Sequence, residues 1–294
     1  MQTIWRDLRF GGRMLTKRPL FTIVAALTLA LGIGANSAVF SVVNAVLLRP
    51  LPYKDASRLA MLSGFDPQRG IRSTSYSIPR FNAIRDQNSV FESLAAVGDD
   101  TFNLTGRQLP EQIQGARVSG DLFHMLGVKP YLGRTFLPEE DQAGGSRVVL
   151  LSYGLWHRLF DTDANIVNQT VELDGQSFTV VGVLPASFNF LDEKYEIWLP
   201  RAFDTSYLAP ESITLGATWL TVLARLKPEV EFGKAQADLE TISVRYRQNN
   251  PGNSDIATNS DLMPLQAAMV DNVRQALLVV LGVVGVVLLI ACVN

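Results

Sequence analysis

The sequence predicts a membrane-anchored α+β protein, and three observations support this fold class. Residues 20–48 form an apolar run without a charged side chain, far longer than the about 18 residues that mark a candidate transmembrane helix. A second apolar run, Ala276–Val293, lies near the carboxyl end. The residues between these runs have the mixed composition of a globular domain. We therefore expect transmembrane helices at 20–48 and 276–294 and one extramembrane domain at 49–275.

The segment 1–19 is expected to be a basic, amphipathic segment in the cytoplasm. Its charged residues before the first run are five basic ones and one acid: Arg6, Arg9, Arg13, Lys17, Arg18 and Asp7. Basic residues beside the first helix favour the cytoplasmic side, which places residues 49–275 outside. Apolar residues interleave with the basic ones, as in a helix lying in the membrane interface. A frayed basic flank fits the same pattern, and the two interpretations stay open.

A cleaved signal peptide is the alternative interpretation of the first run. Its apolar core is about 7–15 residues long and ends in a small-x-small cleavage site. The run here is much longer and leads into the bulky residues Val46, Leu47 and Leu48. We therefore expect an uncleaved anchor.

The first half of the extramembrane domain shows strand and helix signals in alternation. Ser77 is a candidate N-cap of a helix, with Pro79 in its first turn. Asp99 and Asp100 are expected in a loop. The expected elements are a strand at 56–62, a helix at 78–87, a strand at 90–97, a hairpin of 102–105 and 112–118 around Gly106, and a short helix at 120–126 closed by Gly127.

The second half contains the strongest turn signal, Asp174-Gly175 between two alternating runs. Four apolar residues at helical spacing predict a long helix that opens at Pro228 and ends at Asn249; they are Ala235, Leu239, Ile242 and Tyr246. The other expected elements are strands at 147–151, 171–173, 178–181, 196–199, 218–226 and 257–265 and a helix at 153–160.

These elements predict two subdomains. A strand–helix–strand unit lies near each apolar run, at 56–97 and 217–265. We expect one α+β subdomain built from about 49–99 and 214–270. A β-rich subdomain of about 100–213 is expected as an insert between its two parts.

One face of the first apolar helix carries small and polar residues. Gly34, Ser37, Ser41 and Asn44 lie three or four positions apart and form a seam. Small residues allow helix backbones to approach, and polar ones hydrogen-bond across the contact. The seam therefore predicts another membrane helix against it; a lipid-facing surface that tolerates small residues is the alternative.

The residues that carry chemistry in enzymes are not arranged for catalysis. The sequence has no Gly-x4-Gly-Lys-[Ser/Thr] loop, no Gly-x-Ser-x-Gly elbow and no His-Glu-x-x-His motif. His124 and His157 are isolated and are expected to be packed or solvated. The acids Glu139-Glu140-Asp141 are expected on a solvated surface. We therefore predict no enzyme activity, no cofactor and no metal site, and the net charge of −2 argues against nucleic acid.

Four ordered motifs resemble a known family. LGIGANSAVFSVVNAVLLRPLPY at residues 31–53 resembles the first span of MacB-like ABC transporter permeases, and is closest to the acidobacterial duplicated orphan permeases. The other three resemble the periplasmic core of that family. They are RVSGDLFHMLGVKPYLGRTF at 117–136, LLSYGLW at 150–156 and VVGVLP at 180–185.

The resemblance implies a bacterial inner-membrane, multi-pass permease subunit with a porter-like periplasmic domain and a β-rich insert. It implies a separate cytoplasmic ABC ATPase as partner, further permease helices or a second permease half, the lipid bilayer, and a periplasmic partner or substrate. The function expected from it is efflux or mechanotransmission, in which ATP hydrolysis drives work outside the membrane. Mechanical coupling of this kind needs no catalytic residue in this chain.

The resemblance also predicts further helices after Asn294, so the chain is expected to be an N-terminal fragment of a permease. Two other functions stay open. A two-helix anchored binding or sensor module needs a cytoplasmic output domain, which this sequence lacks. An anchored hydrolase needs a nucleophile–base pair or a metal cluster.

Overall fold

The computed structural model describes residues 19–48, 51–66, 70–106, 110–191, 194–204, 208–256 and 259–293. It divides into two compact units, Met1–Pro50 with Met269–Asn294, and Leu51–Ala268, and each is considered by itself below. The predicted basic segment lies outside the described residues except for Pro19. Its amphipathic helix and its cytoplasmic location therefore stay predictions.

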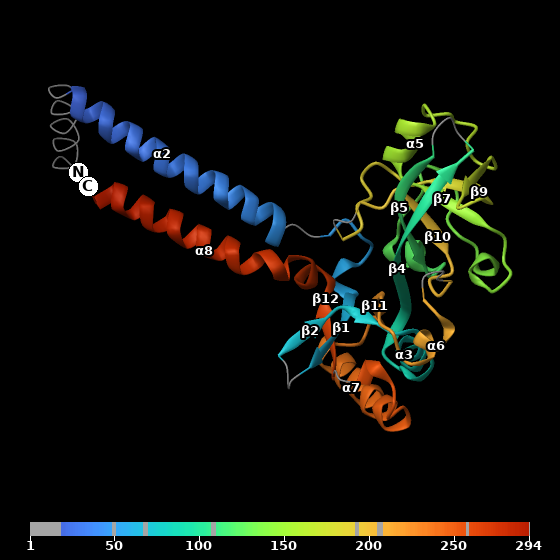
Figure 1. Cartoon of the computed structure of the whole chain (residues 1–294). Coiled ribbons are helices and arrows are strands. Elements are labelled where there is room, and N and C mark those ends of the chain that lie inside the picture. Colours follow the sequence, from blue (N-terminus) through green and yellow to red (C-terminus); the bar gives the residue numbers. More distant parts are fainter. Residues whose placement is uncertain are drawn as a thin grey trace. The chain divides into compact units, whose positions relative to one another are not determined.

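The first unit consists of two long helices (Figure 1). Helix α2, Pro19–Val43, continues into a π-helical turn, η1, at Asn44–Leu48. Helix α8, Leu265–Val293, contributes its residues from Met269 onward. Thr22–Val43 and Val273–Ile290 are long and apolar enough to be candidate membrane spans. Helix α8 starts at Leu265, before the apolar run predicted at 276–294, and the assignment of that run as a transmembrane helix stays a prediction.

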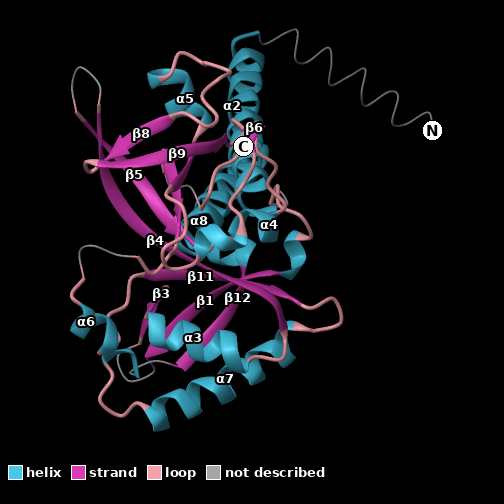
Figure 2. Cartoon of the chain, turned by 90° about the vertical axis from the view of Figure 1, so that its right-hand side faces the viewer, coloured by secondary structure: helices cyan, strands magenta, loops and turns pink. Residues whose placement is uncertain are grey.

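The second unit is built on one large sheet (Figure 2). Its central strands run in the order β12-β1-β11-β4-β5-β10-β7-β9-β6. Most neighbours are antiparallel, but β10 is parallel to β5 and β9 is parallel to β7. The strands are β1 Leu59–Asp66, β2 Ile71–Ser73, β3 Ser75–Tyr76, β4 Phe91–Thr105, β5 Glu111–Val118, β6 Leu132–Gly133, β7 Val148–Leu151, β8 Thr170–Leu173, β9 Gln176–Val183, β10 Ile197–Pro200, β11 Leu220–Leu226 and β12 Asn259–Pro264.

Short helices connect and cover these strands. They are α3 Ile78–Gln87, α4 Leu122–Leu126, α5 Tyr153–Leu159, α6 Pro210–Thr214 and α7 Phe232–Asn249, with 3-10 turns η2 Ala56–Arg58, η3 Pro138–Asp141 and η4 Ser254–Ile256. The predicted α3 is confirmed, and the Ser77 side chain accepts a hydrogen bond from the Arg80 N–H at its first turn. The long helix begins at Phe232, not at Pro228, because a tight turn at Lys227–Val230 and an extended Glu231 precede it.

Strand β4 corrects the prediction of a loop at Asp99 and Asp100. The strand is continuous through both aspartates, which pair with Ala116 and Gly115 of β5. Tertiary partners hold the two carboxylates: Tyr195 donates to Asp99, and Arg117 donates to Asp100 at 2.8 Å. The predicted strands 90–97 and 102–105 are therefore parts of one 15-residue strand.

Two apolar clusters form the core of this unit. The first contains buried residues from 60–96 and 202–262, and the second contains buried residues from 102–199. Of the strands that the structure describes, β4 alone contributes to both, with Phe91 and Ala96 in the first cluster and Phe102 and Leu104 in the second. The four residues of the helical stripe predicted on α7 are buried, and Ala235, Leu239 and Ile242 belong to the first cluster. The predicted boundaries of the two subdomains stay a prediction.

A buried ion pair lies beside Tyr76, a residue of the first cluster. Arg80 and Asp255 are 2% and 4% exposed at their side chains, and their atoms approach to 3.1 Å. The Ser77 hydroxyl donates to the same carboxylate at 2.6 Å, and Arg80 donates to the Ser260 hydroxyl at 2.6 Å. The Arg80 guanidinium also lies 4.6 Å from the centre of the Tyr76 ring. This network joins α3, η4 and β12.

We expect Arg80→Met to destabilise the domain by about 3–5 kcal/mol, because it leaves the Asp255 carboxylate buried without its cation. The free energy of unfolding is measured by urea titration of the full chain in detergent micelles. The matched control is Arg85→Met, a change at an exposed arginine on the same helix. Equal losses for the two variants would contradict the role assigned to the buried pair.

Candidate functional site

The predicted seam lies on exposed positions of the first helix. Gly34, Ser37 and Ser41 are in α2 and Asn44 begins η1, and all four are exposed. Apart from its chain neighbours and the backbone of its own helix, no atom of the described structure lies within 4 Å of the position that a Cβ at Gly34 would take. The Asn36 amide, on a different face, donates to the Val284 carbonyl of α8 at 3.1 Å. The two described apolar helices therefore meet through another face, and the packing role of the seam stays a prediction.

The chain enters and leaves the second unit at neighbouring strands. β1, the first strand, pairs antiparallel with β12, the last, and Ala60 lies opposite Pro264. The start of β1 thus lies beside the end of β12, which continues directly into α8. On α7, the Gln236 amide donates to the Ser260 carbonyl and accepts from the Leu262 N–H. Gln236 therefore binds backbone groups of the edge strand that the pairing with β1 leaves without a partner.

Arg225 of β11 binds the segment that leads into β1, which we call the entering segment. Its side chain is buried and donates to the backbone carbonyls of Lys54, Asp55 and Met125. Burial lowers the pKa of the Arg225 guanidinium from its ordinary value, and repulsion by Arg58 lowers it further. Arginine remains protonated in proteins, so its fork of N–H donors keeps all three carbonyls bound. We call Lys54, Asp55, Arg58, Met125 and Arg225 the junction cluster.

Arg58 forms the exposed side of the junction cluster. It binds Glu92 at 2.6 Å, Asp55 at 3.0 Å and the Leu226 carbonyl at 2.9 Å. The hydrogen bond to Glu92, followed by that to Asp55, raises the pKa of Arg58. The segment between the first apolar helix and β1 is therefore tied to β4, β11 and α4.

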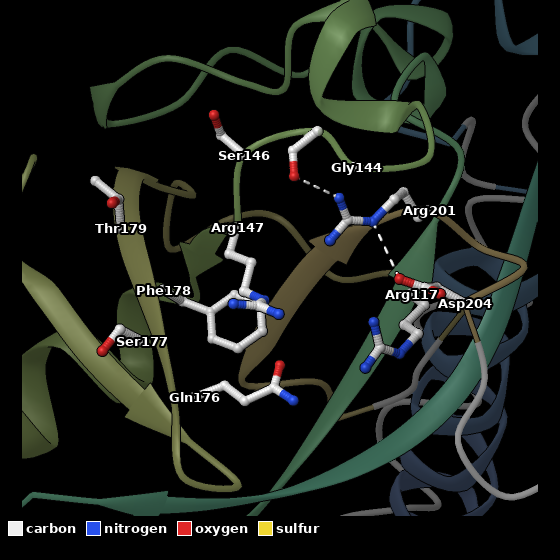
Figure 3. Close-up of a pocket in the computed structure, with 11 residues that line it drawn as sticks. Arg117, Gly144, Ser146, Arg147, Gln176, Ser177, Phe178, Thr179, Arg201 and Asp204 are labelled. Atoms are coloured by element: carbon white, nitrogen blue, oxygen red, sulfur yellow. Dashed lines mark hydrogen bonds and ion pairs between the residues drawn. The ribbon is translucent and has the colours of Figure 1, made fainter.

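A polar cavity of about 760 Å³ lies elsewhere in this unit (Figure 3). The charged residues among its described lining are three arginines, Arg117, Arg147 and Arg201, and one acid, Asp204. They come from β5, from the loop before β7 and from the loop after β10. The remaining described lining residues are Gly144, Gly145, Ser146, Gln176, Ser177, Phe178 and Thr179.

The turn η3 precedes the glycines that line this cavity and corrects the prediction for its acids. Glu140 is buried and binds Arg134 at 2.6 Å, whereas Glu139 is exposed as predicted. Burial alone raises the pKa of Glu140, but hydrogen bonds from Arg134 and from the Leu137 N–H outweigh it and place the pKa below its ordinary value. Asp141 accepts from the Arg201 N–H at 2.7 Å and so ties η3 to the loop after β10.

The histidines and the candidate metal ligands do not form a site. His124 and His157 are exposed, and the His157 ring stacks near Tyr153. Among the residues that the structure describes, no group of three or more His, Cys, Asp or Glu side chains has a geometry that would hold a metal ion. The features of the described chain that could serve a function are therefore the junction cluster and the polar cavity.

The chain belongs to the MacB-like periplasmic core domain family, whose model matches residues 22–242. It therefore carries the MacB-like periplasmic domain of an ABC-transporter-type permease, and this domain implies an inner-membrane protein with a periplasmic segment. The match confirms the resemblance that the motifs predicted; membership of the acidobacterial subgroup stays a prediction.

Solved structures share the fold at low sequence identity. A domain described as that of a permease protein from Porphyromonas gingivalis is 13% identical, with a TM-score of 0.54 over 72% of this chain and 93% of that one. The periplasmic region of MacB from Actinobacillus actinomycetemcomitans is 14% identical, with a TM-score of 0.53 over 74% and 94%. The extracellular domain of the noncanonic ABC-type transporter YknZ from Gram-positive bacteria is 14% identical, with a TM-score of 0.50 over 70% and 99%. A search of curated proteins found no match.

Sequence reasoning missed the junction cluster and the cavity. Arg225 lies in a strand that alternates like any half-buried strand, and no local pattern shows that its side chain faces three carbonyls. The lining arginines are far apart in sequence, at positions 117, 147 and 201. One weak signal exists, the Gly144-Gly145-Ser146-Arg147 run, which marks a loop that ends in a cation.

We expect Glu140→Gln to destabilise the fold by about 1–2 kcal/mol at neutral pH, because it weakens charge-assisted hydrogen bonds to a partly exposed arginine. Since the folded pKa of Glu140 lies below the unfolded one, its contribution is complete above about pH 4.3 and is lost as the pH falls through the lowered value. Urea unfolding of the full chain between neutral and acidic pH measures both effects. Glu139→Gln is the control, and a variant whose stability falls with pH as steeply as wild type would contradict the assignment.

We expect Arg225→Gln to loosen the junction cluster, because one amide cannot replace three hydrogen bonds to separate carbonyls. Amide hydrogen exchange should become faster in residues 54–58 and 122–126 and stay unchanged in β9. Arg245→Gln is the matched control at an exposed arginine of α7. Unchanged exchange in both segments would refute the role given to Arg225.

Proposed function

We propose that this chain is a permease subunit, or its N-terminal part, of a MacB-like ABC transporter. In this proposal it couples ATP hydrolysis by a separate cytoplasmic ATPase to export or mechanotransmission. The observation that carries the proposal is the extent of the family match. Residues 22–242 include most of the first apolar helix and most of the domain that follows it.

The connection between helices and domain supports a mechanical role. Two strands that pair with each other, β1 and β12, are the ones that connect to the apolar helices. A relative displacement of the helix ends would act on this strand pair and on β11, which pairs with β1. Arg225 holds the entering segment to β11 through backbone carbonyls. We infer that the junction cluster transmits force from the helices into the sheet.

The proposal includes the cellular arrangement predicted above. The protein lies in the bacterial inner membrane as a multi-pass protein with its N-terminus in the cytoplasm and residues 49–275 in the periplasm. The domain has a porter-like part and an inserted β-rich part, and the two apolar clusters support this division. Its partners are the ATPase, further permease helices, the bilayer and a periplasmic partner or substrate. The comparisons do not favour the two-helix sensor module, because the matched proteins are transporters or permeases.

Coupling to an ATPase is tested with the chain expressed in its native membrane together with candidate cytoplasmic ABC ATPases of the same organism. The complex is purified into nanodiscs, and amide exchange is measured without nucleotide and with ATP trapped by vanadate. We expect the trapped state to change exchange in β1 and β12, and Arg225→Gln to reduce this change in β1 relative to the Arg245→Gln control. A complex that does not form, or nucleotide states with identical exchange, would contradict the proposed function.

A further inference from the structure

The three arginines of the polar cavity are held there by different means. Arg117 is 15% exposed at its side chain; its Nε donates to Asp100, and its guanidinium lies 5.3 Å from the centre of the Phe102 ring. Its two terminal amino groups make no hydrogen bond to any residue that the structure describes. The side chain is thus anchored at one end and presents its remaining donors to the cavity.

Arg201 is fixed still more firmly. Its side chain is 13% exposed, and Nη1 donates to the Gly145 carbonyl at 2.8 Å. Asp204 lies 3.2 Å from Nε but at an angle that leaves this buried N–H without a hydrogen bond in the described structure. The backbone at Arg201 has a φ of 66°, in the left-handed region that an arginine adopts at a cost. Such outliers persist only where the surrounding structure imposes them, and they concentrate at functional sites.

Arg147 completes the group and is free to respond to a ligand. Its backbone carbonyl accepts from the Thr179 N–H at 2.9 Å, which fixes the loop to β9. Its side chain is exposed and makes no hydrogen bond or ion pair to any residue that the structure describes. Figure 3 shows the Arg147 side chain extending from the loop into the cavity.

The charge of this arrangement calls for an anion. The lining carries three cations against Asp204, which is 62% exposed. Asp100 binds the Arg117 Nε, Asp141 accepts from the Arg201 backbone N–H, and the Arg201 Nη1 is bound to the Gly145 carbonyl. The terminal amino groups of Arg117, the Arg201 Nη2 and the Arg147 guanidinium remain as donors for a ligand. Arg117 and Arg201 are ion-paired with Asp100 and Asp204, so Arg147 is the cation of this group that lacks an ion pair within the described structure. Arginine forks bind carboxylate and phosphate oxygens in a bidentate manner.

We propose that this cavity binds an organic anion that presents a phosphate or carboxylate group to Arg117, Arg147 and Arg201. The volume of about 760 Å³ lies in the range of small-molecule sites and far exceeds the needs of a bare ion. The Gln176 side chain points toward the arginines, and its amide offers a partner for a polar ligand body (Figure 3). The site binds such a ligand whether or not the chain couples to an ATPase.

The test is isothermal titration of citrate and of glycerol 3-phosphate into the full chain in nonionic detergent micelles. We expect saturable binding of at least one probe. Citrate alone would assign a carboxylate ligand, glycerol 3-phosphate alone a phosphate ligand, and both together a general oxyanion site. Arg147→Gln should weaken the binding by at least about ten-fold, the change expected when charge-assisted hydrogen bonds are lost.

Arg147→Gln removes no hydrogen bond and no ion pair within the described structure, so its thermal unfolding without ligand should match that of wild type. Arg245→Gln, which removes the same charge outside the cavity, should bind both probes as wild type does. The proposal is overturned if neither probe saturates, or if Arg147→Gln and Arg245→Gln bind equally well.

Discussion

The antiparallel pairing of β1 with β12 is the constraint on which the organisation of this domain depends. It places the first and last strands of the unit side by side, so the chain enters and leaves at neighbouring points. Strand β11 pairs with the other edge of β1, and β4 pairs with β11. Every later strand of the central order is therefore built outward from a pair that is continuous with the apolar helices. If β1 and β12 were separated, the entering and leaving segments would lose their common support.

Buried charges fix the segments that the hydrogen bonds of the sheet do not reach. Arg80 binds groups from η4 and β12, and Arg225 binds carbonyls of Lys54, Asp55 and α4. Glu140, in η3, binds Arg134 and the Leu137 N–H, which precede this turn. Burying such charges costs free energy, and leaving one without its partner costs more. Each network therefore penalises arrangements in which its segments are displaced. Apolar contacts alone, which are non-directional, would define these positions less sharply.

Local signals in the sequence were sufficient for much of the fold. The Ser77 cap gave the start of α3, and Asp174-Gly175 gave the turn between β8 and β9, where both residues have positive φ. The prediction of a loop at Asp99-Asp100 was wrong, because adjacent carboxylates indicate a solvent-exposed loop unless their binding partners are known. Those partners, Arg117 and Tyr195, lie at least 17 residues away in sequence. The polar cavity was missed for the same reason, since its cations meet only through the sheet.

Strand β4 connects the two regions for which a function is proposed, the junction cluster and the polar cavity. Its first half pairs with β11, the strand of Arg225, and its second half pairs with β5, the strand of Arg117. Asp100 of β4 itself holds the Arg117 side chain at the wall of the cavity. A shift of β4 driven from the junction would therefore move a ligand-binding group, and a bound anion would resist that shift. Coupling in this sense requires two discrete arrangements of β4, each favoured by one of the two regions. The hydrogen bond between Asp100 and Arg117 is the contact through which such arrangements would be distinguished.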